Sequence, residues 1–202
     1  MSVEDNLSKL RSYSEELGLD LTRQEDRFKW FLASTLFAKR ISAEIAKRTY
    51  RRFEEEGLTT PEEILAAGWD RLVQVLDSGG YVRYDFSTAS SLLRIMGELK
   101  ERYGDLEALH RESSSPSDLE KHLQEFRGVG PVGVNIFLRE LRGIWEKAKP
   151  KPSRIAVKTA QRIGLDYVEP YESALVRVNL EYCKKGGCED CPVKNNCKEK
   201  SN

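Results

Sequence analysis

The chain has 202 residues, enough for one large domain or two small ones, each able to bury a core. Lysine plus arginine number 33, as do aspartate plus glutamate, so the net charge gives no argument for a nucleic-acid partner. No apolar run approaches the roughly 20 residues of a membrane span, and no signal-like stretch opens the chain, so we expect a cytoplasmic protein without a membrane partner.

Helical patterns run along nearly the whole sequence. Residues 2–18 form an amphipathic run, and residues 28–37 carry so much apolar bulk that we expect the central core helix there. Residues 43–56 form a further helix that stops at Gly57. All three tryptophans are expected in the core and both histidines on the surface; these are Trp30, Trp69, Trp145, His110 and His122.

Proline, glycine and serine mark the ends of the next helices. Thr60 and Pro61 open a short helix that Gly68 closes, and a second short helix ends at Gly79 and Gly80. Further helices are predicted over 87–103, after Ser115, and over 119–126 and 131–145. No convincing period-2 alternation appears, so the sequence predicts an all-α protein of about ten short helices. Linkers are expected at 112–117 and at 147–153, which is basic and rich in proline.

All four cysteines lie in one segment near the end of the chain: Cys183, Cys188, Cys191 and Cys197. Four soft ligands in one short segment can converge on one metal centre with little loop-closure cost. A zinc ribbon normally uses two Cys-x2-Cys pairs, whereas this segment has one, so a [4Fe-4S] cluster is favoured over structural zinc. Disulfides are the least favoured alternative, because they would need an exported chain.

The second motif, residues 126–131, reads Phe-Arg-Gly-Val-Gly-Pro and lies between two predicted helices. Two glycines one residue apart let a backbone turn tightly and bring its amides up to an anion, and the following helix adds a favourable dipole. A plain turn between packed helices is the alternative. We expect phosphate contacts from the backbone or side chains of Arg127, Gly128, Val129 and Gly130.

Together, these motifs resemble the helix-hairpin-helix (HhH-GPD) DNA glycosylase superfamily, most closely its endonuclease III branch with a C-terminal [4Fe-4S] loop. The hairpin, the apolar helix after it, Ile155-Ala156-Val157 and the four cysteines follow in the family's order. The resemblance covers most of the chain from about Phe28. It implies two helical lobes that bind damaged or abasic duplex DNA during base excision repair, extrude a base and cleave its N-glycosidic bond.

The resemblance also implies a domain organisation. Residues 1–25 would be an N-terminal helix of the cluster-side lobe, and residues 26–145 the other lobe, with the helix-hairpin-helix at about 119–145. Residues 146–202 would complete the cluster-side lobe, with the [4Fe-4S] loop at 183–197. We expect a monomer that binds double-stranded DNA.

Both catalytic residues of the family are replaced. Its Schiff-base lysine would stand at Val132, and its aspartate at Lys158, after a strand-like approach over 155–157. Cleavage develops positive charge on the sugar, so a cation in place of the carboxylate costs roughly 6 kcal/mol, or about four decades in rate. Family chemistry would then need another acid, for which the candidates are Asp85, Asp166, Glu169 and Glu172.

Two lysines are candidate site residues. Neighbouring cations and partial burial would favour a neutral amine at Lys158, which could attack the aldehyde of an abasic sugar. The alternative is a charged Lys158 that contacts phosphate. Lys39 aligns with the polar residue that family members insert where the flipped base leaves the stack, with a solvated lysine at a helix end as its alternative.

Three functions therefore compete. The missing catalytic pair favours a DNA-binding protein of the endonuclease III type, which recognises damaged or abasic duplex DNA. The alternative is a divergent but active glycosylase or abasic-site lyase that uses Lys158 or another acid, so whether the chain is an enzyme stays open. A cluster-bearing redox or scaffold protein without DNA is the third.

Overall fold

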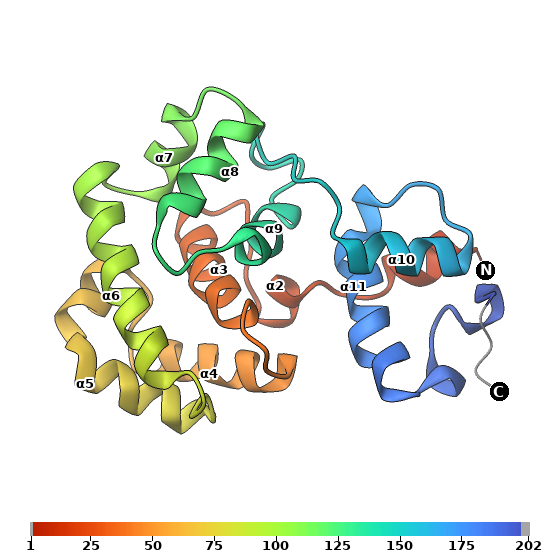
Figure 1. Ribbon diagram of the computed structural model, residues 1–202, viewed down its shortest axis with the longest axis horizontal. Helices are drawn as coiled ribbons and strands as arrows, with labels where there is room; N and C mark the ends of the chain where they lie inside the picture. The colour runs from red at the N-terminus through yellow and green to blue at the C-terminus, as the bar shows by residue number, and fades with distance from the viewer. Residues whose placement is uncertain (1, 199–202) are drawn as a thin grey trace. The chain divides into compact units, whose positions relative to one another are not determined.

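The computed structural model describes residues 2–198 of the chain (Figure 1). Every regular element in this range is a helix, which confirms the predicted all-α class. The chain divides into two compact units, the first formed by Met1–Glu16 with Pro150–Asn202 and the second by Leu17–Lys149. Among the described residues, no helix combines the length and the apolar character needed to cross a membrane.

The second unit is built around α3 (Gln24–Phe37), which packs against α4 (Ala43–Glu55) and α9 (Pro131–Arg139). Apolar side chains cover most of its circumference, so it is buried on nearly all sides. Its most buried residues are at most 1% exposed: Trp30, Phe31, Leu32, Ala33 and Leu36. The prediction of a central core helix over residues 28–37 is confirmed.

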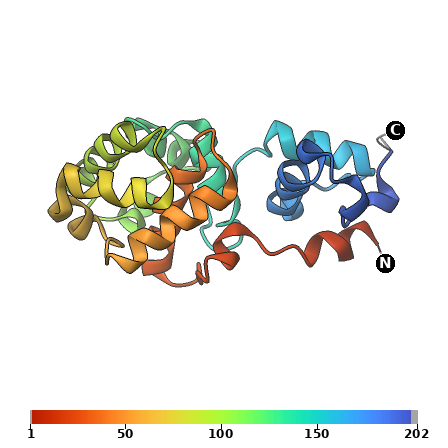
Figure 2. The ribbon, with the colours of Figure 1, turned by 90° about the horizontal axis from the view of Figure 1, so that it is seen from below.

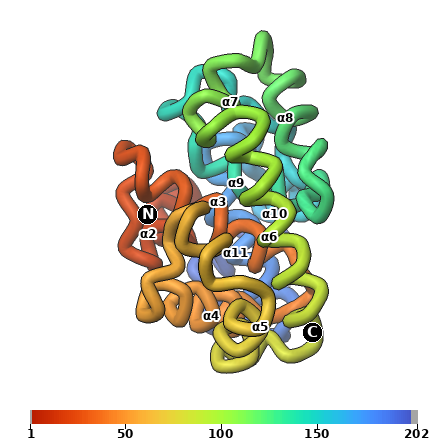
Figure 3. Tube along the Cα trace, turned by 90° about the vertical axis from the view of Figure 1, so that its left-hand side faces the viewer, coloured from red at the N-terminus to blue at the C-terminus, as the bar shows by residue number. Residues whose placement is uncertain are grey.

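Next in the chain, α5 (Pro61–Gly79) and α6 (Asp85–Arg102) lie side by side (Figure 3). The start of α5 is capped by Thr60, whose Oγ1 accepts a hydrogen bond from the Glu63 N–H at 3.2 Å. Gly68 has φ +73° and kinks the helix. The two short helices predicted around Gly68 are therefore the two halves of one bent element.

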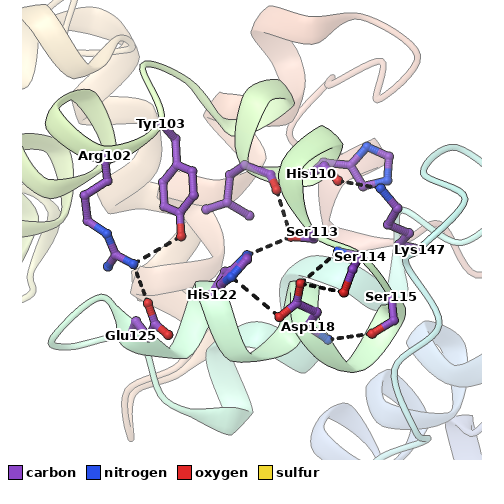
Figure 4. A network of polar contacts seen from close by, with 11 residues as sticks. Arg102, Tyr103, His110, Ser113, Ser114, Ser115, Asp118, His122, Glu125 and Lys147 are labelled. Carbon is purple, nitrogen blue, oxygen red and sulfur yellow. Dashed lines mark hydrogen bonds and ion pairs between the residues drawn. The ribbon is translucent and has the colours of Figure 1, made fainter.

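A polar network joins α7 (Leu106–Glu112) to α8 (Pro116–Glu125), as Figure 4 shows. The Ser113 Oγ lies 3.0 Å from Nδ1 of His122, and the Ser114 N–H donates to Asp118 Oδ2 at 2.8 Å. The serine-rich segment predicted as a linker is therefore a hydrogen-bonded turn inside the second unit. It fixes the start of α8, the helix that leads into the glycine motif.

The first unit is formed by both ends of the chain. Its helices are α1 (Val3–Ser8), α2 (Tyr13–Glu16), α10 (Arg154–Ile163), the 3-10 turn η1 (Glu169–Tyr171) and α11 (Glu172–Glu181). Figure 2 shows α1, in red, beside the blue C-terminal segment. The amphipathic run predicted over residues 2–18 is thus two short helices, and its apolar residues join a core shared with α10 and α11.

Candidate nucleic-acid interface and cysteine loop

The helices α8 and α9 are joined by a tight turn over residues 126–130. The Val129 N–H donates to the Phe126 carbonyl at 2.9 Å and closes the turn. Gly130 is then the N-cap residue of α9, which has Pro131 at its first position and ends at Arg139, earlier than predicted. A helix, a glycine turn and a second helix therefore follow one another where the motif predicted them.

Gly128 determines how this turn packs. Its φ is +115°, a conformation that L side chains rarely adopt. A Cβ added there would lie 2.9 Å from Oγ and 3.0 Å from Cβ of Ser91 in α6. The turn rests directly on α6, and glycine alone satisfies both the backbone conformation and the space.

Gly130, two residues on, faces open space. Its φ is −96°, and a Cβ added there would meet nothing within 4 Å. Within residues 2–198, neither its N–H nor that of the 63% exposed Val132 donates a hydrogen bond. Two open donors at the positive end of a helix dipole can hold a phosphate oxygen.

Cations lie next to these donors. Arg127 is exposed in the turn itself. Lys39 follows α3, and the Cβ of its neighbour Ala38 lies 3.5 Å from the position of a Cβ added at Gly133 in α9. The fold thus brings the segment of Lys39 beside the start of α9.

Val129 in the motif differs from expectation, whereas Val132, just after the motif, is as predicted. Val129 is only 8% exposed, and its N–H is used inside the turn, so its backbone is not a phosphate donor. Val132 is exposed, and it offers no amine at the place of the family's lysine.

The four cysteines follow α11 on three short 3-10 turns, η2 (Cys183–Lys185), η3 (Cys188–Asp190) and η4 (Lys194–Asn196). Cys191 is buried in the core of the first unit, and Cys183 and Cys197 pack against the same core. Burial raises the pKa of the Cys191 thiol, and the charges of the other three cysteines raise it further. Three of the four cysteines thus lie on one core.

The four thiols are suitable metal ligands, but their positions do not form a coordination site. In the part of the chain that the structure describes, no three His, Cys, Asp or Glu side chains form a ligand set. Four cysteines around one buried member are nevertheless the donors that [4Fe-4S] clusters and structural zinc require. The segment supplies the ligands, and a bound group would have to draw them together.

The strand-like conformation predicted for residues 155–157, before Lys158, is not observed. Ser153 caps α10 by accepting a hydrogen bond from the Ala156 N–H at 3.4 Å, so residues 155–157 form the first turn of a helix. Lys158 is exposed on the next turn instead of partly buried. The partial burial predicted for Lys158 is therefore not observed.

Among the candidate acids, Glu172 alone is buried, with 1% of its surface exposed. Its Oε1 accepts a hydrogen bond from the Ser153 N–H at 2.8 Å and so ties the start of α11 to the start of α10. Asp166 and Glu169 are exposed, and Asp85 belongs to the second unit. Glu172 thus holds its carboxylate at the start of α10.

An exposed aromatic pair escaped the sequence analysis, which placed every tryptophan in the core. Trp69 is 40% exposed and Phe86 is 59% exposed, with ring centroids 5.2 Å apart. The Trp69 Nε1–H donates to the Ser90 Oγ at 2.9 Å and fixes the indole. Only the packing of α5 on α6 makes this pair, so no local sequence signal could have shown it.

His110, predicted on the surface, is half-buried. Its ring stacks on Trp145 with centroids 4.5 Å apart and planes 4° from parallel. The Lys147 Nζ donates to the His110 carbonyl at 2.9 Å, as Figure 4 shows. Burial and the nearby Lys147 lower the pKa of His110.

The structure therefore offers two candidate sites, one in each unit. The hairpin and its cations lie in the second unit, and the cysteine segment with Lys158 lies in the first. Comparison with known proteins found no matching family model, no matching curated protein and no matching solved structure.

Proposed function

We propose that this chain is a DNA-binding protein of the base excision repair type, which recognises damaged or abasic duplex DNA without the standard glycosylase chemistry. The observation that carries the proposal is the open N-terminus of α9 at Gly130. It is formed by a glycine turn whose packing on α6 leaves its outer side uncovered. The resemblance of the hairpin and of the cysteine spacing to the HhH-GPD superfamily supports a DNA ligand.

The chemistry of the turn suits a phosphodiester. Backbone N–H groups fix the position of a phosphate without reading sequence, and Arg127 and Lys39 add affinity that depends on salt. A turn of this kind contacts the backbone of DNA and leaves the bases to other parts of the protein.

The residues at the two catalytic positions of the family argue against its usual catalysis. Val132 supplies no nucleophile, and Lys158 is a cation where a carboxylate would lower the barrier. An abasic-site lyase is the second candidate function. The one observation in its favour is that Lys158 forms no ion pair within residues 2–198, whereas its exposure removes the partial burial on which the amine route was predicted.

Borohydride trapping on an abasic duplex separates the two functions. A covalent adduct that is lost in Lys158→Ala and kept in Lys39→Ala would establish the lyase. Without an adduct, Lys158→Ala should weaken binding equally for all DNA sequences, as expected for a phosphate contact.

The DNA-binding proposal is tested by a matched pair of substitutions at Gly130. The site has room for any side chain, so Gly130→Glu and Gly130→Ala should both fold. A carboxylate about 4 Å from a phosphate costs about 4 kcal/mol at an effective dielectric of 20, so Gly130→Glu should weaken duplex binding by about three decades. Fluorescence anisotropy with damaged and undamaged duplexes measures this. Equal affinity of both variants and the wild type would refute the proposal.

We also propose that Cys183, Cys188, Cys191 and Cys197 hold a [4Fe-4S] cluster. When bound, the cluster would crosslink the three 3-10 turns through thiolate ligands. Anaerobically purified protein should be yellow-brown and carry about four irons and four sulfides per chain. A colourless protein with one tightly held zinc ion would contradict this assignment.

A further inference from the structure

The exposed face of α10 carries a row of three cations. Arg154, Lys158 and Arg162 follow one another at intervals of four residues, so they lie on one side of the helix. The other side is buried and is formed by Ala156, Thr159, Ala160 and Ile163. Like charges at this spacing destabilise a helix, so the stability of α10 does not explain the row.

These cations form one wall of a pocket inside the first unit. The pocket has a volume of about 400 Å³ and is also lined by Ile155, Asn179, Cys183 and Lys184. None of the residues that line it is an acid. Four basic side chains therefore face one concave space, where walls of low dielectric strengthen their combined potential.

Another cation of the first unit, Arg177, is paired with carboxylates. The Arg177 guanidinium lies 2.9 Å from Glu16 and 3.0 Å from Glu181, so it has two carboxylate partners. In the described part of the chain, Arg154 and Lys158 have no such partner. At least two of the four pocket cations, Arg154 and Lys158, therefore have no carboxylate partner in the described range.

We infer that this pocket binds a phosphate group. Guanidinium groups match phosphate oxygens with paired N–H donors, lysines add compact charge, and the Asn179 amide supplies a neutral donor. Several cations around one space favour an anion with more than one charge over a carboxylate. The inference goes beyond the proposed function, because the hairpin belongs to the second unit and the pocket to the first.

The phosphate could belong to a nucleic-acid backbone or be a free phosphate, and the first experiment tests the shared chemistry. Inorganic phosphate is titrated into the full chain and followed by phosphorus NMR. Lys184→Gln should weaken binding roughly tenfold, the effect of losing one charge-assisted hydrogen bond. Lys185→Gln is the matched control, because this exposed neighbour carries the same charge outside the pocket.

The second experiment identifies the source of the phosphate. If a DNA backbone occupies the pocket, Arg154→Gln with Lys158→Gln should reduce the slope of log affinity for duplex against log salt by about two. If free phosphate is the ligand, the double variant should lose inorganic phosphate binding and keep the wild-type slope. Either result supports a phosphate pocket.

The inference is overturned if inorganic phosphate does not saturate a site and the double variant keeps the DNA slope. Equal effects of Lys184→Gln and Lys185→Gln in both assays would overturn it too. Gly130→Glu separates it from the proposed function, because this substitution should weaken duplex binding by about three decades and leave inorganic phosphate binding unchanged. Circular dichroism checks that every variant is folded.

Discussion

Replacing Gly128 by alanine should destabilise the second unit strongly, although it adds a single methyl group. The new Cβ would have to adopt φ +115° and would lie 2.9 Å from the Ser91 Oγ. The backbone strain costs about 1–2 kcal/mol. Overpacking against α6 adds about 1–2 kcal/mol, so we expect a total loss of about 3 kcal/mol.

Gly130→Ala is the matched control. The same methyl group enters open space at φ −96°, so the free energy of unfolding should change by less than about 1 kcal/mol, because the lower entropy of the unfolded chain opposes the poorer N-cap preference of alanine. Urea denaturation followed by tryptophan fluorescence suits both variants, because all three tryptophans lie in the second unit. The signal therefore reports the unit that contains the hairpin.

A double-mutant cycle separates the two causes. Ser91→Gly removes the clashing side chain but costs about 1 kcal/mol itself, because it places glycine inside α6. In the double variant, Ser91→Gly should reduce the destabilisation caused by Gly128→Ala by about 1 kcal/mol, which is the coupling energy of the two substitutions. The backbone strain at residue 128 should remain. Equal stabilities for Gly128→Ala and Gly130→Ala would show that the turn does not rest on α6 and would refute this reasoning.

Two further predictions concern charge. Because the pKa of His110 is lowered below its ordinary 6.5 in the folded protein, the unfolded chain binds more protons near that pH. The urea midpoint of the second unit should therefore fall as pH decreases through this window, and His110→Phe should flatten the change; an unchanged pH dependence in that variant would contradict this. Arg177→Met leaves Glu16 and Glu181 without their cation and should cost the first unit about 3 kcal/mol. Circular dichroism should register this loss while tryptophan fluorescence does not; a matching shift in fluorescence would show that the units unfold together.

Helix starts could be predicted because their causes are local. Ser42, Thr60 and Ser115 each accept a hydrogen bond from the N–H three residues later, so the cap and its partner are neighbours in sequence. The core helix over residues 28–37 was equally visible, because its apolar bulk leaves no polar face for solvent. The glycine turn was found for the same reason, since both of its special positions are glycines.

The sequence-based predictions were wrong where contacts with distant residues, or a weak local signal, determine the structure. Residues 155–157 are partly β-branched and read as strand-like, yet Ser153 caps a helix whose buried face packs on α11. The exposure of Trp69 depends on how α5 lies on α6, and the burial of His110 depends on a ring 35 positions later in the sequence, at Trp145. No window of neighbouring residues contains these contacts.

The structure of the cysteine segment also depends on residues that are distant in the sequence. Its spacing is visible in the sequence, but its turns are too short to be stable alone, so their order depends on what they pack against. Cys191 and Val193 share a core with Val3 and Leu7 from the other end of the chain, and the Arg177 guanidinium donates to the Arg11 carbonyl. The cysteine segment is therefore held by the N-terminal helix as well as by its own neighbours. The spacing of the cysteines can be read from the sequence, but their packing is a property of the whole first unit.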